Sequence, residues 1–453
     1  MTRLIVVSNR VSAPTDAAAP SSGGLAMALR AALQDHGGLW FGWSGETSEH
    51  AQSEPPKTRT VGGIQTVTAA LTEHELETYY NGYANRTLWP LLHQRLDLMA
   101  SDRELAKGYL AVNARFAALL APLIEPDDQV WVHDYHLIPL ASELRKLGVT
   151  CRIGFFLHTP WPAHQIFRAL PEHRARAREL LAYDLIGFQT EEWRRAFEDY
   201  LARDDAEIAA ETGRQPRTGV YPIGIDAEAF AKALETTAAG RAHDRLMASC
   251  AFRKVLLGVD RLDYSKGLED RLRGFEQFLA DNPDQHRRVT FVQIANLSRE
   301  QVESYQQIRA RLDALAGHIN GAYADFDWSP VRYVNREHRR DHLAGLYRAA
   351  HVGLVTPLID GMNLVAKEYV AAQNPDDPGV LILSRFAGAA EQMKDALLIN
   401  PYSADELADA IRRALAMPKQ ERLKRWETLA HGVRTDDVTA WRRSFLKDLS
   451  ASA

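Results

Sequence analysis

Two cationic side chains follow one short apolar run at a spacing suited to binding a diphosphate. Residues 255–259 (VLLGV) are expected to form a strand, and the chain continues as D-R-L-D-Y-S-K-G at 260–267 with a helix directly after it. Arg261 and Lys266 then lie on a strand-to-helix turn, where a guanidinium fork and a point charge flank a helix N-terminus. Such a set can hold a pyrophosphate without a metal. A surface loop in which these cations pair with the loop's own aspartates is an equally good interpretation of the spacing.

A second strand, expected at 352–355, leads into T-P-L-I-D-G-M-N-L-V-A-K-E at 356–368. We expect a helix to start at Asp360 and Gly361, which leaves the backbone N–H groups of 361–363 facing a ligand beyond the strand. Glu368 would follow about two turns later, where a carboxylate can accept both hydroxyls of a ribose. By itself the motif favours an Asp N-cap with a solvated Glu. Beside the loop of Arg261, ligand binding becomes the favoured interpretation.

Polar groups also follow the strands expected in the N-terminal half. Residues 4–7 end at S-N-R, which places Arg10 at a strand terminus, and Gly23 and Gly24 precede a helix where the backbone can approach a ligand closely. A plain glycine turn explains the glycine pair equally well.

The motif H-D-Y-H at 133–136 follows a third strand, and His158 follows the next. A carboxylate and an imidazole at neighbouring strand ends suit the recognition of sugar hydroxyls and proton transfer. A metal site at His133, Asp134 and His136 is disfavoured because no separate ligand motif accompanies them, and a packed histidine is commoner. The aromatic residues at 40–43, 79, 80 and 89 can stack on sugar rings, but buried aromatics are usually core.

Alternating strands and helices position these groups. Short runs rich in Val, Ile and Phe predict buried parallel strands, whereas capping-box patterns at Ser101, Ser298 and Ser403 open some of the amphipathic segments between them. The pattern indicates a doubly wound α/β fold, with a domain boundary near Asp226 and a ligand site in the cleft between the domains. The strands are expected at 4–7, 130–132, 153–157, 185–188, 255–259, 289–294, 352–355 and 380–383, and the main helices at 105–123, 137–147, 269–279 and 301–315.

Composition limits the class of protein. The chain has 453 residues, 46% of them apolar, and a net charge of -5, so we expect two globular domains and no general attraction to nucleic acid or to anionic membranes. Only Cys151 and Cys250 are present, which excludes a disulfide scaffold. With no signal segment and no membrane-length apolar run, a cytoplasmic protein is expected. The fingerprints of Rossmann dinucleotide enzymes, P-loop proteins, zinc proteases and α/β-hydrolases are missing.

Six motifs in one order identify a family. S-N-R, G-G-L, L-W-F-G-W-S-G, H-D-Y-H, R-L-D-Y-S-K-G and D-G-M-N-L-V-A-K-E span nearly the whole chain. In combination they closely resemble the trehalose-6-phosphate synthases, retaining glycosyltransferases of the GT-B type (family 20). The resemblance implies two Rossmann-like domains with the active site in the cleft between them. Residues 1–226 would bind the acceptor and 227–435 the nucleotide sugar, and a C-terminal helix at about 436–453 would cross back to the first domain.

The resemblance also implies roles for individual residues. Glucose 6-phosphate would be the acceptor, with its phosphate held by Arg10 and Arg299. UDP-glucose would be the donor, with Arg261 and Lys266 neutralising the departing diphosphate and no metal or other cofactor required. The implied acceptor residues are Arg10, Tyr80, Trp89, Asp134 and Arg299; the donor residues are Gly23, Gly24, His158, Arg261, Lys266, His338, Asp360, Gly361, Met362, Asn363, Leu364, Val365, Ala366, Lys367 and Glu368; the catalytic residues among them are Asp134, His158, Arg261, Lys266 and Asp360.

One departure concerns the nucleotide base. His338 stands where a relative carries Phe, so the base preference depends on whether that contact is made through the backbone.

The reaction implied is transfer of glucose to the anomeric hydroxyl of glucose 6-phosphate, with retention and by front-face attack, giving trehalose 6-phosphate and UDP. No carboxylate is an evident covalent nucleophile, so Asp134 would orient the acceptor. A homo-oligomer, either a dimer or a tetramer, and a separate phosphatase acting on the product are also expected.

Alternatives of two classes remain. One is a transferase of the same fold with another acceptor, such as glycerol 3-phosphate, or another nucleotide donor. The other is a non-catalytic sugar-phosphate sensor, which the presence of Arg261, Lys266 and Glu368 disfavours. A phosphorylase-like enzyme would need pyridoxal phosphate, for which the sequence offers no case.

Overall fold

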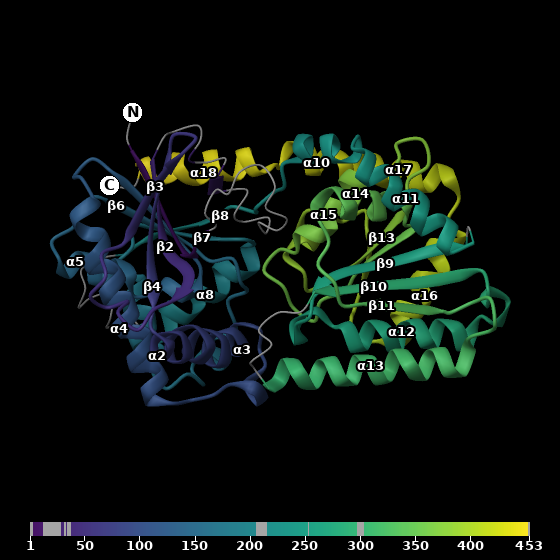
Figure 1. The fold of residues 1–453 in the computed structure, drawn as a ribbon, viewed down its shortest axis with the longest axis horizontal. Coiled ribbons are helices and arrows are strands. Elements are labelled where there is room, and N and C mark those ends of the chain that lie inside the picture. The colour runs from purple at the N-terminus through teal and green to yellow at the C-terminus, as the bar shows by residue number, and fades with distance from the viewer. Residues whose placement is uncertain are drawn as a thin grey trace. The chain divides into compact units, whose positions relative to one another are not determined.

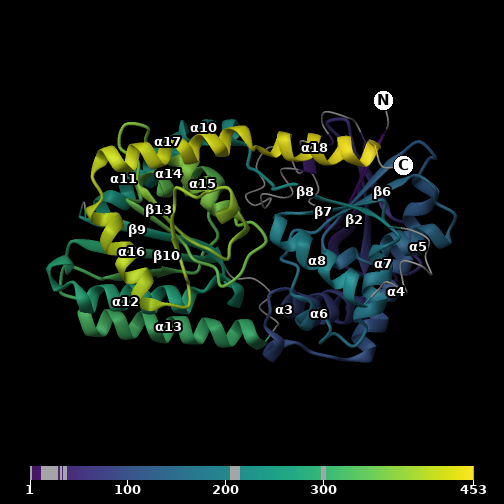
Figure 2. The same cartoon turned by 180° about the vertical axis from the view of Figure 1, so that it is seen from behind.

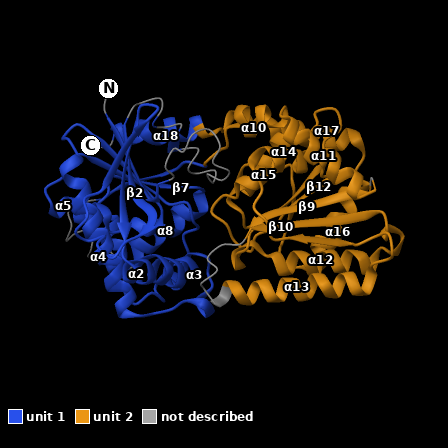
Figure 3. Cartoon of the chain, viewed as in Figure 1, with its two compact units in different colours: residues 1–222, 439–453 blue, residues 223–438 orange. Residues whose placement is uncertain are grey.

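The computed structural model of the chain describes residues 3–11, 29, 30, 33, 38–204, 215–251, 253–296 and 303–451. The chain divides into two compact units (Figure 3): unit 1 comprises residues 1–222 and 439–453, and unit 2 comprises residues 223–438. Each unit is built around its own sheet.

The sheet of unit 1 has eight strands within the described residues, in the order β3-β4-β2-β1-β5-β6-β7-β8. All neighbours pair in parallel except β3 with β4, which form an antiparallel hairpin at one edge. The central strands are buried along almost their whole length, as parallel strands covered on both faces must be. The strands are β1 (Leu4–Arg10), β2 (Gly38–Thr47), β3 (Lys57–Val61), β4 (Ile64–Leu71), β5 (Gln129–His133), β6 (Arg152–Phe156), β7 (Leu185–Phe188) and β8 (Arg217–Val220).

Helices cover both faces of this sheet (Figure 1). Phe116 of α4 packs edge-on against Phe41 of β2 on one face. On the other, Phe445 of α18 stacks on Trp131 of β5 and fills the space left by glycines in β6 and β7. The helices described in unit 1 are α2 (Glu73–Glu75), η1 (Leu76–Leu88), α3 (Trp89–Leu92), η2 (Leu96–Leu98), α4 (Arg103–Leu120), η3 (Ala121–Leu123), η4 (Tyr135–Leu137), α5 (Leu140–Lys146), α6 (His164–Phe167), α7 (His173–Leu180), α8 (Glu191–Asp204) and α18 (Val438–Ala451), of which all but Val438 lies in unit 1.

The sheet of unit 2 has six parallel strands among the residues described, in the order β11-β10-β9-β12-β13-β14. Figures 1 and 2 show helices on both sides of it: α12, α13 and α16 on one face, and α14, α15 and α17 on the other. The strands are β9 (Lys254–Arg261), β10 (Val289–Asn296), β11 (Val331–Val334), β12 (Val352–Val355), β13 (Val380–Ser384) and β14 (Leu397–Ile399); the helices are α10 (Ala227–Leu234), α11 (Thr237–Ser249), η5 (Tyr264–Lys266), α12 (Leu268–Asp281), η6 (Pro283–Gln285), α13 (Glu303–Tyr323), α14 (Arg340–Ala349), α15 (Leu364–Ala372), η7 (Gly388–Glu391), α16 (Ala404–Ala416) and α17 (Lys419–Thr435).

The doubly wound α/β prediction is confirmed, and each of the eight expected strands is present. The sequence analysis did not predict β2, β3, β4, β8, β11 and β14. All of them except β2 are short or partly polar and give no long apolar run, whereas the aromatic residues at 40–43 of β2 were considered for sugar stacking and not as a strand.

The capping predictions had mixed outcomes. Ser403 caps α16 as expected, through its side chain and the N–H of Glu406. The cap predicted at Ser101 is wrong, because Asp102 is the N-cap of α4. Ser298 lies outside the described residues.

Candidate active site

The loop after β9 brings Lys266 against the end of β12. Gly267 has φ of 62°, and a Cβ at this position would lie 2.5 Å from the carbonyl oxygen of Thr356. Only glycine tolerates both the left-handed backbone and this close approach. The N–H of Leu358 also donates to the carbonyl of Ser265 at 2.8 Å. The two loops predicted to bind a ligand are therefore joined through their backbones.

A buried arginine that the sequence did not suggest holds these strand ends together. Arg271 on α12 is 0% exposed and donates to Asp260 at the end of β9 and to Gln293 on β10. It also donates to the hydroxyl of Thr356 at 2.9 Å and to the carbonyl of Lys266 at 3.3 Å. One guanidinium thus connects three strands and the Lys266 loop. It looked like an ordinary amphipathic-helix residue in the sequence, since nothing in a linear pattern shows which arginine turns inward.

Lys266 forms an ion pair with Asp360, with Nζ 2.5 Å from Oδ2. Both side chains are mostly buried, and the amide of Asn363 also donates to the same carboxylate oxygen at 3.1 Å. Arg261, at the end of β9, is exposed. The structure therefore brings Lys266 and Asp360, 94 residues apart, into direct contact.

The loop from Asp360 to Asn363 is an extended connection and not the start of a helix. The N–H of Asp360 donates to the carbonyl of Phe386, and the carbonyls of Asp360 and Met362 accept from Gly388 and Ala389. Helix α15 begins at Leu364, and its N-cap Asn363 has φ of 73°. The helix start predicted at Asp360 is wrong, because these pairings and the left-handed Asn363 delay it. The N–H groups that lack an intrahelical acceptor are those of the first turn of α15, which begins at Leu364.

Glu368 and Lys367 point to different surroundings although they are adjacent on α15. Tyr347 donates its hydroxyl to Glu368 at 3.3 Å, and burial raises the pKa of Glu368 to about 6. Lys367 is 2% exposed, and its ammonium donates to the carbonyl of Ile223 and to the amide oxygen of Gln392, both at 2.8 Å. Burial lowers the pKa of Lys367 to about 8. Its side chain is thus engaged away from Glu368.

In unit 1, Arg10 at the end of β1 contacts aromatic side chains. Its guanidinium lies 5.8 Å from the ring centroid of Trp43 on β2, and Tyr80 lies 5.4 Å from the same ring. Tyr80 also stacks on His136 at 5.9 Å. The structure therefore brings Arg10 and Tyr80 together through Trp43, whereas Trp40, in the same strand, is buried at 2% exposure and is a core residue.

The segment that carries Tyr80 is a π-helix, η1, which leads directly into Trp89 at the start of α3. Trp89 is 6% exposed and packs 5.6 Å from Tyr135. Long π-helical segments are rare and are often found at functional sites, and no simple sequence pattern announces them.

Asp134 occupies backbone space that is almost reserved for glycine, with φ of 76° and ψ of 164°. Its N–H donates to the carbonyl of Phe156, and its carboxylate accepts the N–H of His158 at 3.2 Å. Backbone strain of this kind concentrates at functional sites. The structure thus joins Asp134 and His158 directly.

His158 is linked to a second histidine. Its Nε2 lies 3.1 Å from Nδ1 of His133, and its Nδ1 lies 3.3 Å from the side-chain nitrogen of Gln189. Burial lowers the pKa of His158 to about 3 and that of His133 well below its usual range. Both rings are therefore neutral near pH 7. His133, considered above as a metal ligand, is fully buried and contacts His158.

Three predicted residues, Gly23, Gly24 and Arg299, lie outside the described residues. His338 precedes α14 and stacks on His342 at 4.7 Å. Burial and the neighbouring His342 lower the pKa of His338.

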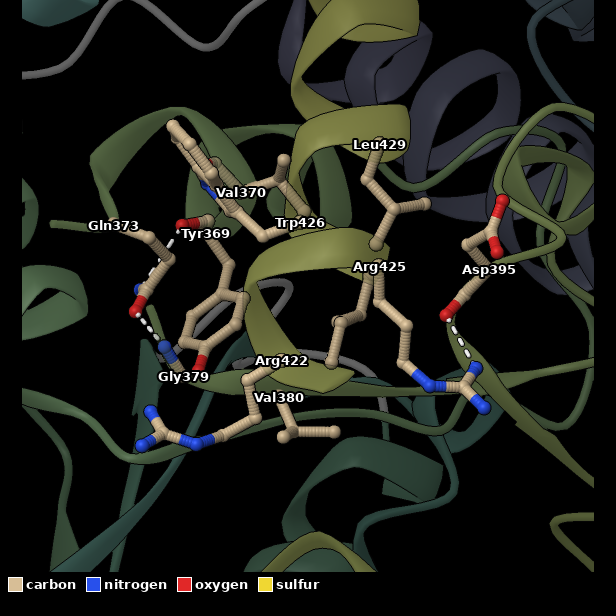
Figure 4. A pocket seen from close by; sticks show the side chains of 11 residues that line it. Tyr369, Val370, Gln373, Gly379, Val380, Asp395, Arg422, Arg425, Trp426 and Leu429 are labelled. Atoms are coloured by element: carbon tan, nitrogen blue, oxygen red, sulfur yellow. Dashed lines mark hydrogen bonds between the residues drawn. The ribbon is translucent and has the colours of Figure 1, made fainter. Parts of the chain in front are cut away.

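A small pocket on the far end of α15 is not a ligand site (Figure 4). It measures about 10 Å³, which is room for about one water molecule. Trp426 of α17 donates its indole N–H to the carbonyl of Val370 on α15 beside it, at 3.0 Å. The pocket marks where α17 anchors α15.

The family profile of glycosyltransferase family 20 matches residues 2–451. The chain belongs to this family. A trehalose-6-phosphate synthase of Sinorhizobium fredii is 47% identical, over 100% of this chain and 99% of the relative. The crystal structure of a UDP-forming alpha,alpha-trehalose-phosphate synthase from Burkholderia vietnamiensis matches with a TM-score of 0.95 and 47% identity, covering 100% of this chain and 99% of that one. A Burkholderia xenovorans synthase, solved in complex with glucose 6-phosphate, matches with a TM-score of 0.93 and 45% identity over 99% and 100% of the chains.

This family member is therefore a glycosyltransferase, and the family resemblance seen in the motifs is confirmed. Over the described residues, His, Cys, Asp and Glu side chains form no group of three that could hold a metal ion. None of the described helices has the length and apolar character needed to cross a membrane.

Proposed function

We propose that this chain transfers glucose from UDP-glucose to the anomeric hydroxyl of glucose 6-phosphate, releasing UDP and α,α-trehalose 6-phosphate. The observation that carries the proposal is the contact between Lys266 and Asp360, which joins the two donor motifs at the strand ends of unit 2. The full-length similarity to UDP-forming synthases, one of them solved with glucose 6-phosphate, supports both substrates.

We assign donor binding mainly to unit 2, with Gly23, Gly24 and His158 of unit 1 as further donor residues. Arg261 and Lys266 would neutralise the diphosphate as the bond to glucose breaks, and no metal would be needed. The N–H groups of Leu364 and Val365, at the start of α15, suit an anion. Glu368 would accept the ribose hydroxyls, and Asp360 would bind the glucosyl group while it also restrains Lys266.

We assign acceptor binding mainly to unit 1, with Arg299 contributed by the sequence range of unit 2. Arg10 would hold the phosphate of glucose 6-phosphate together with Arg299, while Tyr80 and Trp89 contact the sugar. Asp134 would orient the acceptor. His158, also from unit 1, would bind the donor, since its neutral ring can donate or accept a hydrogen bond with a hydroxyl of the donor sugar without adding a charge.

The proposed chemistry is front-face transfer with retention. The bond from the anomeric carbon to the diphosphate oxygen breaks, the acceptor's anomeric oxygen bonds to the same face of that carbon, and the acceptor proton passes to the departing oxygen. Arg261 and Lys266 stabilise the charge on that oxygen. Asp134 takes no part as a nucleophile, which distinguishes the reaction from that of retaining glycosidases with paired carboxylates.

The broader biological setting is also part of the proposal. We place the protein in the cytoplasm as a homo-oligomer, with a separate phosphatase acting on its product. Neither nucleic acid nor a membrane is expected as a partner.

The test is UDP release from UDP-glucose, with glucose 6-phosphate or glycerol 3-phosphate as acceptor and with or without EDTA. Turnover with glucose 6-phosphate alone, unaffected by EDTA and lost in Lys266→Ala, is expected. Lys394→Ala, which removes an exposed lysine of the same unit, is the control and should keep full activity. Turnover that EDTA abolishes would refute the cation-held diphosphate, and binding of glucose 6-phosphate without turnover under any condition would indicate a sensor.

A further inference from the structure

Lys367 is a buried charge with an unusual set of partners. The side chain is 2% exposed, although moving an ammonium group out of water is costly unless hydrogen bonds replace its hydration. Its ammonium donates to the carbonyl of Ile223 and to the amide oxygen of Gln392, both 2.8 Å from Nζ. Neither partner belongs to the proposed donor site. The ammonium of Lys367 therefore contacts groups that lie outside that site.

Those partners lie at the two places where the chain passes between the units. Ile223 is the first residue of unit 2, and the second passage follows Val438. Gln392 uses both ends of its amide: the oxygen accepts from Lys367, and the nitrogen donates to the carboxylate of Asp436 at 3.0 Å. One lysine thus reaches the first passage directly and the second through a single side chain.

The two passages also touch each other within unit 2. Val438 donates its N–H to the carbonyl of Ile225 at 3.3 Å. A Cβ on Gly224 would lie 2.1 Å from the carbonyl oxygen of Asp436, so only glycine permits this approach. Segments 223–225 and 436–438 therefore form one paired connection, which we call the paired linker.

Helix α15 fixes this paired linker to the proposed donor site. Lys367 is adjacent to Glu368, and the opposite end of the helix is anchored by the hydrogen bond from Trp426 to Val370. A movement of the paired linker therefore acts on helix α15, which also carries Glu368, the carboxylate proposed to bind the ribose.

We propose that Lys367 is a positioning residue that clamps the paired linker to helix α15 and so couples donor binding in unit 2 to acceptor binding in unit 1. This inference rests on the proposed function, in which most donor residues lie in unit 2, most acceptor residues lie in unit 1, and the two ligands must meet for transfer. A fixed linker allows each ligand to favour the arrangement that the other requires. A loose linker leaves each site intact but uncouples the two.

The test measures binding and turnover separately in the full chain. UDP affinity is determined by calorimetry without and with saturating glucose 6-phosphate, a pair that cannot react. In the unmodified protein we expect the sugar phosphate to tighten UDP binding by roughly fivefold or more, a typical coupling between sites. In Lys367→Met, UDP alone should bind within about twofold of normal while the coupling disappears and kcat falls about tenfold.

Matched variants separate the clamp from general damage. Lys394→Met removes an exposed lysine nearby and should change neither coupling nor kcat. Gly224→Ala should reproduce the loss of coupling by forcing the two segments apart, whereas Gly432→Ala, where a Cβ meets nothing within 4 Å, should not. Should Lys367→Met fail to fold, Gln392→Ala removes the link to Asp436 alone and is expected to weaken the coupling.

Three results would overturn the inference. One is unchanged coupling in the clamp variants. Another is an absence of coupling in the unmodified protein. The third is a loss of affinity for UDP alone in Lys367→Met as large as that in Glu368→Gln, which would make Lys367 part of the donor site. Failure of the proposed function gives a different result, because the unmodified protein would then show no turnover with glucose 6-phosphate.

Discussion

The variant Asp134→Gly should be more stable than Asp134→Ala, although both should be inactive. With φ of 76° and ψ of 164°, the backbone at Asp134 lies in a region that costs a side-chain-bearing residue about 1–3 kcal/mol. Both substitutions remove the carboxylate that accepts the N–H of His158, so this loss cancels when the two variants are compared.

Strain relief and chain entropy then set the difference between the two variants. Glycine recovers the strain but loses about 0.5–1 kcal/mol through the greater freedom of the unfolded chain. With the middle of each range, Asp134→Gly should therefore be more stable than Asp134→Ala by about 1 kcal/mol. For a unit of this size that corresponds to roughly 2–4 °C in the midpoint of thermal unfolding.

The assay is thermal unfolding of both variants, with the same pair at Asp199 as control. Asp199 is an exposed residue within helix α8, where glycine should be less stable than alanine by about 1 kcal/mol. We therefore expect the glycine variant to be the more stable of the pair at position 134 and the less stable at position 199. UDP release should fall about 100-fold or more in both Asp134 variants, because the acceptor is no longer oriented. An Asp134→Gly protein that melts below Asp134→Ala, as at position 199, would refute the claim of strain.

Three further outcomes are expected. Arg271→Met should lower the free energy of unfolding by about 3–5 kcal/mol, because it leaves the Asp260 carboxylate buried without its cation. In denaturant titrations, adding Asp260→Asn should restore much of this free energy. If it restores none, lost packing and not the unpaired charge causes the destabilisation. The kcat/KM for UDP-glucose should fall as the pH drops through about 6, where Glu368 gains a proton. Tyr347→Phe should shift this acid limb of the pH profile to higher pH, because it removes a hydrogen-bond donor to the charged carboxylate. An acid limb that does not shift would contradict the role of Tyr347. Because the pKa of His158 is depressed to about 3, the unfolded state takes up the proton first as the pH falls below about 6.5, and stability should decline from there towards pH 3. In melting curves recorded at several pH values, His158→Gln should make this decline less steep. An equally steep decline in the variant would mean that other groups cause it.

The sequence by itself determined the fold class and the main functional motifs. Buried parallel strands read as continuous apolar runs because both of their faces are covered, so all eight predicted strands could be found from the sequence. Polar residues that follow such strands must lie at the carboxyl ends of the strands of their own sheet, which is why Arg10, Asp134, Lys266 and Asp360 could be selected as candidate site residues. The order of the motifs was sufficient to indicate the family.

Only the tertiary structure decided which side chains meet and which way each one points. Lys266 reaches Asp360 across 94 residues, and Arg271 turns inward between three strands, whereas adjacent Lys367 and Glu368 diverge. Such contacts depend on loop paths and on left-handed residues such as Asp134 and Asn363, whose backbone angles are imposed by surrounding hydrogen bonds and not by their own preferences. A local pattern carries no information about partners distant in the chain, so the charge pairing and backbone strain at the site appear only when the whole unit is folded.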